Sequence, residues 1–451
     1  MKKIIAGVLL AMLIMLAGCG KSGPNESALP TLESSPPTIQ DTDEYMRGDS
    51  VALYNETLSS GVFFELFEDG RLVLSGGDIR ESIVDTRAFK DYQDNITILE
   101  IGDGVSVVGE KAFAGASKIQ KIEIGDSVQT IEYYAFSNCT ELTQVSFGAN
   151  LREIGDYAFS GCTKLNDVSL GNNISVVGGY VFSGCTGLKN ATLGSSIQKL
   201  GNCVFDGCTS LTSMRIGCDV STSALSNNTK LVSVVLEDTV RHLGSRAFSG
   251  CTELQNITFS QNLLTIEGYA FSECAKLRDA TLPESVIEIG DRAFSDCTEL
   301  ATAYIGSSVQ SMGQLIFSGC KELKNLECRS SIGYASFKDC EALEFVTLAP
   351  SVTVIGEQAF SGCKALVEAI LPEGVETIGA RAFYNCEAMR KLSLPKTLQS
   401  VGREIFYGTK ELRTLYYNGS SGQWSRVEKE KGWSKNIPGC IQWINDFEIK
   451  S

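Results

Sequence analysis

Phenylalanine recurs at intervals of 23 residues along most of this 451-residue chain. Leu225 fills one slot of the series, and the two steps that end at Leu225 and Phe337 are 20 residues long. The other positions of the series are Phe113, Phe136, Phe159, Phe182, Phe205, Phe248, Phe271, Phe294, Phe317, Phe360, Phe383 and Phe406. Fourteen copies of one short unit predict a stacked array, because a single unit cannot bury its own apolar edge.

The slots around the phenylalanine are equally regular. Glycine stands four residues before it in eleven of fourteen units, with Glu132, Ser221 and Glu267 as the exceptions, which indicates a tight backbone turn. Six residues after it every unit has Leu, Ile or Met. The last six residues of a unit, such as 165–170, alternate apolar and polar side chains, which predicts a short strand.

The motif Val-x-x-Ile-Gly-x-x-Ala-Phe-x-Gly-Cys-x-x-Leu resembles the BspA-like leucine-rich repeats of bacterial surface proteins, over roughly residues 60–445. The resemblance implies a curved right-handed solenoid of leucine-rich-repeat type, with short strands, turns, short helical segments and a cap at each end. Strands stacked about 4.8 Å apart would give a core about 65 to 70 Å long.

We expect the array to occupy residues 96–415. Residues 51–95 resemble the N-terminal cap of such proteins, with a hairpin signal at Asp69 and Gly70. Residues 416–451 resemble their C-terminal cap. Caps cover the apolar edge that an end unit would otherwise expose.

The first 50 residues differ in composition from the repeats. Residues 1–19 have a basic start and an apolar centre, which indicates an export signal, and they end in Leu-Ala-Gly-Cys, which resembles a bacterial lipobox with Cys19 as the acylated residue. An incidental cysteine behind an ordinary signal peptide is the alternative. Residues 20–50 hold four of the nine prolines and few large apolar side chains, so we expect a disordered tether about 30 Å long.

Within that tether, Arg47, Gly48 and Asp49 resemble the integrin-recognition tripeptide of matrix proteins. A charged linker explains the same three residues more simply. The formal net charge of −15 argues against nucleic acid as a partner.

Sixteen cysteines raise the question of metal or disulfide chemistry. Eleven stand at one slot, three residues after the phenylalanine, where Ala116, Asn228 and Thr409 also occur. We interpret the slot as a buried ladder in which cysteine serves as a small hydrophobe. Its spacing also allows oxidised pairs. No Cys-x-x-Cys occurs and His242 is the one histidine, which speaks against a zinc site.

Motifs of catalysis are missing from the sequence. Four Ser-x-x-Lys matches occur without supporting motifs, and two of them belong to the repeat turn itself. We therefore expect neither an enzyme nor a cofactor.

If the unit-ending strands form one sheet, the residues on either side of the central Val point outward. Small polar side chains dominate the first half of that face, and aromatic and apolar ones enter the second half at Tyr304, Phe345, Ile370 and Tyr416. Exposed anchors of this kind predict a surface for a protein or glycan. Strand formers on a half-exposed sheet are the alternative interpretation.

The resulting hypothesis is a lipid-anchored, surface-exposed bacterial protein for adhesion or macromolecular recognition, with a protein or glycan on a host or neighbouring cell as its partner. An envelope-organising or glycan-capturing lipoprotein that acts near its own membrane is the alternative, which the short tether favours.

Overall fold

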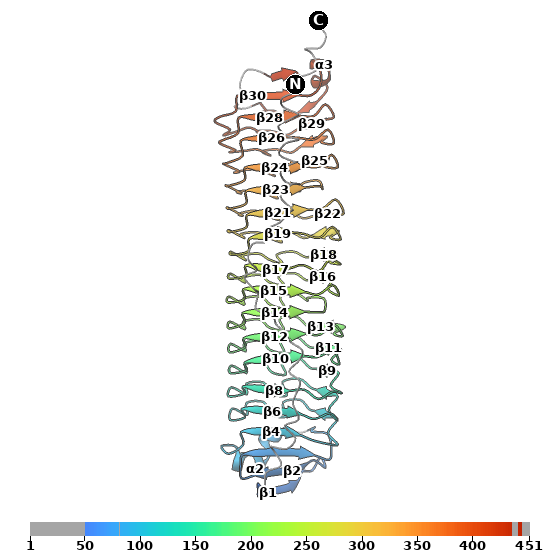
Figure 1. Ribbon diagram of the computed structural model, residues 1–451, viewed down its shortest axis with the longest axis vertical. Helices are drawn as coiled ribbons and strands as arrows, with labels where there is room; N and C mark the ends of the chain where they lie inside the picture. The colour runs from blue at the N-terminus through green and yellow to red at the C-terminus, as the bar shows by residue number, and fades with distance from the viewer. Residues whose placement is uncertain (1–49, 81, 435–440, 444–451) are drawn as a thin grey trace, which may run out of the picture. The chain divides into compact units, whose positions relative to one another are not determined.

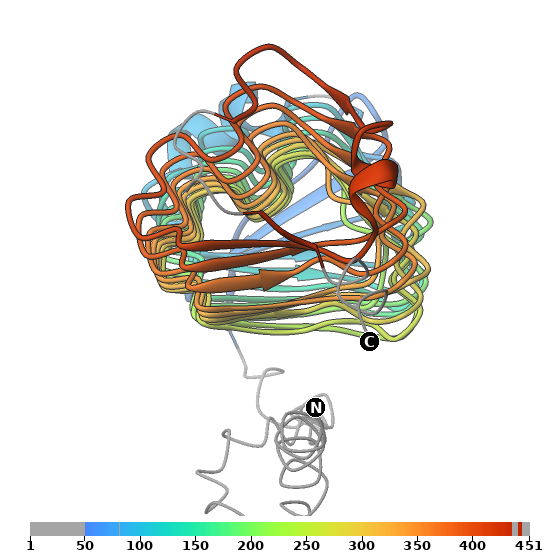
Figure 2. The same cartoon turned by 90° about the horizontal axis from the view of Figure 1, so that it is seen from above.

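The computed structural model describes residues 50–80, 82–434 and 441–443. From Val51 onward these residues form one compact unit, a β-solenoid of about 15 turns with parallel stacked strands (Figure 1). Viewed along the stacking axis, successive turns follow nearly the same outline (Figure 2). Cys19 and the Arg47-Gly48-Asp49 motif lie outside the described residues.

One side of the solenoid, which we call the long-strand face, carries the strand predicted at the end of each unit. Strands pair parallel and in register at the repeat step, so that Asp167 lies opposite Asn190 and Leu170 opposite Leu193. The strands of this face are β4 (Ile98–Ile101), β6 (Lys121–Ile124), β8 (Gln144–Ser146), β10 (Asp167–Leu170), β12 (Asn190–Leu193), β14 (Ser213–Ile216), β15 (Ser233–Leu236), β17 (Asn256–Thr258), β19 (Asp279–Thr281), β21 (Thr302–Ile305), β23 (Asn325–Cys328), β24 (Phe345–Leu348), β26 (Glu368–Ile370), β28 (Lys391–Leu394), β30 (Thr414–Tyr417) and β32 (Ile441–Trp443).

This face is divided into four sheets, with breaks between β8 and β10, β17 and β19, and β24 and β26. The strand before each break has a half-buried central residue, Val145, Ile257 or Val346, where most other strands have a fully buried one. The ladder is therefore interrupted where the inward side chain is less tightly enclosed.

A second row of two-residue strands, the short-strand face, precedes the glycine slot of each unit. It consists of β5 (Val107–Val108), β7 (Thr130–Ile131), β9 (Glu153–Ile154), β11 (Val176–Val177), β13 (Lys199–Leu200), β16 (His242–Leu243), β18 (Thr265–Ile266), β20 (Glu288–Ile289), β22 (Ser311–Met312), β25 (Val354–Ile355), β27 (Thr377–Ile378), β29 (Ser400–Val401) and β31 (Glu428–Lys429). Its two breaks fall at the two 20-residue units, between β13 and β16 and between β22 and β25.

Side chains replace backbone acceptors in those short units. In a 23-residue unit one carbonyl accepts two amides of the next turn, as the Arg241 carbonyl does from Leu264 and Thr265 (2.8 and 3.2 Å). In the first short unit the Asp219 carboxylate accepts the amides of Arg241 and His242 (2.7 and 2.9 Å). Ser331 Oγ does the same in the second short unit. The amides of the following turn therefore keep hydrogen-bond acceptors although the short unit lacks three residues.

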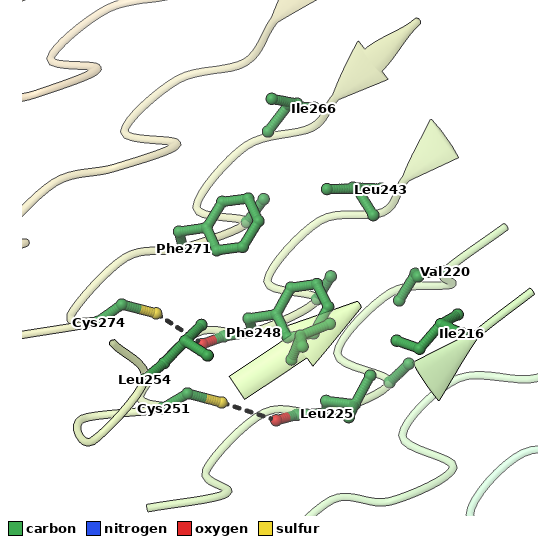
Figure 3. Close-up of a cluster of buried hydrophobic side chains, with 14 of the residues drawn as sticks. Ile216, Val220, Leu225, Leu243, Phe248, Cys251, Leu254, Ile266, Phe271 and Cys274 are labelled. Atoms are coloured by element: carbon green, nitrogen blue, oxygen red, sulfur yellow. Dashed lines mark hydrogen bonds between the residues drawn. The ribbon is translucent and has the colours of Figure 1, made fainter. Parts of the chain in front are cut away.

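The core is a column of stacked phenylalanines. Ring centres of consecutive units lie 5.0 to 5.6 Å apart, and the rings are within 19° of parallel. Leu225 divides the column, and Figure 3 shows it below Phe248 and Phe271.

The cysteine slot is a hydrogen-bond donor slot. Each of its eleven thiols donates to the carbonyl of the phenylalanine slot in the preceding unit, at 3.1 to 3.4 Å. Figure 3 shows two of these bonds, from Cys251 to Leu225 and from Cys274 to Phe248. Asn228 and Thr409 also donate to a phenylalanine-slot carbonyl. The prediction of a small buried hydrophobe was therefore incomplete, because the residue at this slot also donates a hydrogen bond in every unit except that of Ala116.

The fourteen cysteines that the structure describes are free thiols. The oxidised pairs that the spacing allows are therefore not formed among them.

Left-handed backbone occurs in every unit two residues before the phenylalanine slot. None of these fourteen residues is glycine, and their φ angles lie between 50° and 60°. The amide of each donates to a carbonyl of the next turn, for example Tyr157 to Gly179 (2.9 Å). Stacking hydrogen bonds thus hold a conformation that L-residues otherwise avoid.

The structure shows what would crowd a side chain at the glycine slot. A Cβ on Gly201 would lie 2.2 Å from the backbone nitrogen of Gly179 in the preceding turn. Close approach of two turns, and not a positive φ, therefore favours glycine at this slot, although three units have Glu132, Ser221 or Glu267 there.

Among the described residues, helices occur at the two ends of the solenoid. At the first end β1 (Ala52–Thr57), β2 (Phe63–Phe67) and β3 (Arg71–Ser75) form antiparallel pairs, followed by η1 (Ile83–Asp85) and α2 (Arg87–Tyr92). At the other end α3 (Ser421–Trp424) starts with a capping box and packs Trp424 edge-on against Tyr417 (5.0 Å). No helix among the described residues is long and apolar enough to cross a membrane.

Candidate recognition surfaces

All four residues of the predicted binding surface lie on the long-strand face, but their exposures differ. Phe345 and Ile370 are 63% and 61% exposed, whereas Tyr304 and Tyr416 are half-buried. Along the face Tyr304 lies on β21, Phe345 on β24, Ile370 on β26 and Tyr416 on β30. The two tyrosines are thus each separated from the nearer apolar residue by one intervening strand.

Tyr304 is held by a charged cluster. Its hydroxyl donates to the Glu284 carboxylate, and the guanidinium of Arg329 lies 5.3 Å from its ring centre. Arg329 also pairs with Glu327 (2.9 Å) and Glu284 (3.6 Å). Burial, followed by the hydrogen bond to Glu284, raises the pKa of Tyr304 to about 12. The Tyr304 side chain is therefore in contact with Glu284 and Arg329 and offers little ring surface to a partner.

Tyr416 is similarly engaged. Lys391 Nζ lies 5.4 Å from its ring centre and pairs with Glu368 at 2.5 Å. Both tyrosines thus border the apolar pair rather than extend it.

Phe345 and Ile370 lie on either side of the interruption between β24 and β26. Glu368 and Ile370 take the places in their unit that Phe345 and Thr347 take in the preceding one, so the two apolar residues are diagonal neighbours on consecutive turns. Val367 is 43% exposed and precedes β26 directly. These three residues define what we call the apolar patch.

Charged side chains of both signs surround the patch. Glu344 precedes Phe345, Glu368 is exposed on β26, and Glu327 lies opposite Thr347 on the neighbouring strand. Glu327 and Glu368 are paired with Arg329 and Lys391. The exposed residues Lys324 and Arg390 belong to the adjacent turns, where the Lys324 carbonyl accepts the Phe345 amide (3.1 Å) and the Arg390 amide donates to the Val367 carbonyl (2.8 Å). The rim of the patch therefore carries charges of both signs.

A second row of surface residues, most of them half-buried, was missed by the sequence reasoning. The fourteen left-handed residues line one edge of the solenoid, which we call the left-handed edge. Tyr134, Tyr157 and Tyr180 stack there with ring centres 4.7 Å apart. Further along, Tyr269 lies between the guanidiniums of Arg246 (5.0 Å) and Arg292 (5.9 Å). The 23-residue spacing of these tyrosines was the available signal.

The buried thiols are poor candidates for chemistry. Burial raises the pKa of Cys251 to about 12 and that of Cys363 well above its ordinary value. A thiol that stays protonated is a weak nucleophile and metal ligand. The described residues contain no group of three or more His, Cys, Asp or Glu side chains placed to hold a metal ion.

Each stacked unit has a strand on the long-strand face, a buried Leu slot and a turn centred on Phe. These features define a leucine-rich-repeat solenoid, a fold typical of binding scaffolds. The model of the BspA type Leucine rich repeat region matches residues 82–212, 219–333 and 330–425. The chain belongs to this family.

Two of the solved structures of similar fold come from bacteria. A leucine-rich repeat protein from Bacteroides ovatus is 24% identical, with a TM-score of 0.59 over 89% of this chain and all of that one. A leucine rich cell surface protein from Faecalibacterium prausnitzii is 21% identical, with a TM-score of 0.38 over 84% of this chain and 98% of that one. Comparison with the curated proteins finds no match.

Proposed function

We propose that this chain is a bacterial lipoprotein, anchored through Cys19 and displayed on the cell surface, that recognises a protein partner through its long-strand face. The observation that carries the proposal is the apolar patch. Phe345 and Ile370 are 63% and 61% exposed, and they lie on neighbouring turns of the same face of the solenoid.

The net charge of the chain indicates the chemistry of the partner. The patch is bordered by charges of both signs, whereas the whole chain has a formal net charge of −15. A protein surface of net positive charge with an apolar projection is complementary to this charge and to the patch. Such binding weakens as salt rises, because exposed charges are screened.

The signal-like segment 1–19 and the lipobox-like residues before Cys19 support display outside the cytoplasm. Labelling with a fatty-acid analogue tests the anchor: the wild-type chain takes up label, and Cys19→Ser does not. Protease treatment of intact cells tests display. Removal of the solenoid supports an outward position, and full protection supports the envelope-organising alternative instead.

The partner is tested on an array of matrix and cell-surface proteins at physiological salt. Each hit is measured again with a Phe345→Ser and Ile370→Ser double variant. We expect at least a tenfold loss, about 1.4 kcal/mol or more, from removing two central anchors.

Val235→Ser is the matched control. Val235 is 38% exposed on β15 of the same face, five units before the unit that holds Phe345. Its substitution leaves binding unchanged. A hit that survives the double variant, or an array without hits, contradicts the proposal.

A further inference from the structure

The first short unit, residues 215–234, and the second short unit, residues 327–346, interrupt the short-strand face in the same way. In each of them an isolated bridge, such as that between Val220 and Leu243, replaces the paired short strands. The cores of the two units differ, however. The second short unit is therefore an internal reference for the first.

The core of the second short unit is continuous with its neighbours. Phe337 stacks on Phe317 and on Phe360, with ring centres 5.5 Å apart on both sides. The Cys340 thiol donates to the Phe317 carbonyl (3.2 Å). Ser330 Oγ donates to two carbonyls of the preceding turn, at 2.9 and 3.1 Å. Three kinds of contact thus connect this unit to other turns although its short strand is missing.

The first short unit lacks the ring stacking and the serine bonds. Leu225 stands in the phenylalanine slot and offers its neighbours, Phe205 and Phe248, no ring to stack on. Cys218 takes the place of Ser330, and this buried thiol forms no hydrogen bond with the preceding turn. The phenylalanine column is therefore divided where the short-strand face is also interrupted.

The cysteine slot of the first short unit holds a buried polar atom without a partner. Asn228 Nδ2 donates to the carbonyls of Phe205 (3.1 Å) and Leu225 (2.7 Å). Asn228 Oδ1 is the one buried side-chain nitrogen or oxygen of the described residues that lacks a hydrogen-bond partner. A buried acceptor without a donor destabilises the closed arrangement, and contact with water would satisfy it. Opening this unit therefore costs less free energy than opening the second short unit.

The long-strand face stays intact at the same place. Strands β12, β14, β15 and β17 pair parallel and in register through the first short unit. Their inward residues Met214 and Val234 are buried. The first short unit is thus connected to its neighbours by a complete sheet on one side and by few contacts on the other.

We propose that the first short unit is a hinge of the solenoid. The long-strand sheet stays paired, and the short-strand side opens between this unit and the turns next to it. Opening on one side bends the arm of residues 51–214 relative to the arm of residues 235–434. The apolar patch lies on the second arm, so bending changes its direction relative to the first arm. This inference does not depend on what the patch binds.

Hydrogen exchange of the full chain, resolved to single residues, tests the hinge in the wild type. The Val220 and Leu225 amides each donate to a carbonyl of the following turn at 2.9 Å. The Ile332 and Phe337 amides do the same in the second short unit, also at 2.9 Å. We expect protection factors about tenfold lower or more at Val220 and Leu225, because their side of the unit opens more often.

The long-strand face supplies the control for this measurement. The amides of β14 and β15 should be as well protected as those of β23 and β24 in the second short unit. Equal protection at Val220 and Ile332 contradicts the hinge. Loss of protection in β14 and β15 also contradicts it, because the whole unit would then unfold rather than bend.

Exchanging the two cores tests which residues create the hinge. The double variant Leu225→Phe and Asn228→Cys gives the first short unit the core of the second, which shows that a 20-residue unit accommodates both side chains. It should raise protection at Val220 about tenfold. The reverse double variant, Phe337→Leu and Cys340→Asn, should lower protection at Ile332. The first double variant is decisive because it restores contacts, and unchanged protection at Val220 overturns the proposal.

Distances between two labels test bending directly. Lys199 and Glu288 lie on the short-strand face on either side of the first short unit, and Ser311 and Ser400 take the same slots around the second. Both pairs are 89 residues apart. Nitroxide labels on unnatural amino acids leave the native thiols unmodified. Pulsed electron paramagnetic resonance should give a broader distance distribution for the first pair, narrowed to that of the second pair by the first double variant. Equal widths in the wild type overturn the hinge.

Discussion

Replacing Phe294 tests whether ring stacking, beyond apolar volume, stabilises the solenoid. Phe294 is fully buried, and its ring lies 5.0 Å from that of Phe271 and 5.1 Å from that of Phe317, within 10° of parallel. Two such contacts contribute about 1 to 3 kcal/mol in total beyond area burial. Phe294→Ala removes these contacts and leaves a cavity, so it should cost about 3 to 5 kcal/mol. Phe294→Leu keeps most of the volume and should cost about 1 to 3 kcal/mol.

Hydrogen exchange followed by mass spectrometry is the appropriate assay, because turns contact only their neighbours and lose stability locally. The Phe271 and Phe294 amides donate to Ala293 and Ile316 of the following turns, at 2.7 and 2.9 Å. In Phe294→Leu their exchange should accelerate about tenfold to a hundredfold, while the turns near β4 and β30 keep their wild-type rates.

Val235→Thr on the exposed face is the control and should stay within about 0.5 kcal/mol of the wild type. The reasoning is wrong if Phe294→Leu behaves like this control, because stacking would then contribute nothing beyond volume. It is also wrong if exchange accelerates evenly along the whole solenoid.

Four further predictions follow from the hydrogen bonds and the thiols. A thiol reagent should label Cys203, which is partly exposed, in the native protein, and should reach buried thiols such as Cys251 only after denaturation. Cys320→Ser keeps a donor for the carbonyl of the preceding unit, so its urea midpoint should exceed that of Cys320→Val by the equivalent of about 1 kcal/mol. Asp219→Ala deprives two amides of the next turn of their acceptor and should cost about 1 to 3 kcal/mol in urea unfolding. A hydrogen bond from Ser106 lowers the pKa of Asp78 below its usual 3.8. The ionised Asp78 therefore stabilises the fold fully above pH 3.8, and this stabilisation is lost as the pH falls through the lowered pKa. Asp78→Ala should accordingly lose less stability between pH 7 and pH 3 than the wild type does.

The repeat architecture was predictable because its cause is local and recurs. Each unit repeats the same Phe, Gly and Leu slots, so one interpretation of a unit predicts the others, and the register of the strands follows from the 23-residue step. The family resemblance rests on the same slots, and the fold confirms it. Even the two short units were visible as 20-residue steps.

The role of single side chains between turns was not predictable. Cysteine at one slot is equally consistent with a small hydrophobe and with a donor, and only the position of the preceding carbonyl distinguishes them. The acceptor role of Asp219 likewise depends on which amides the shortened turn leaves opposite it.

The sequence by itself determined which side chains point away from the core on the long-strand face, because a strand alternates with a period of two. Only the tertiary structure decided which of them a partner can reach. Tyr304 is contacted by Glu284 and Arg329, which come from other turns, whereas Phe345 and Ile370 lie exposed on either side of an interruption of the sheet. The backbone of the left-handed edge was likewise decided by the tertiary structure. Hydrogen bonds between turns fix this backbone, and no single unit contains both partners of those bonds.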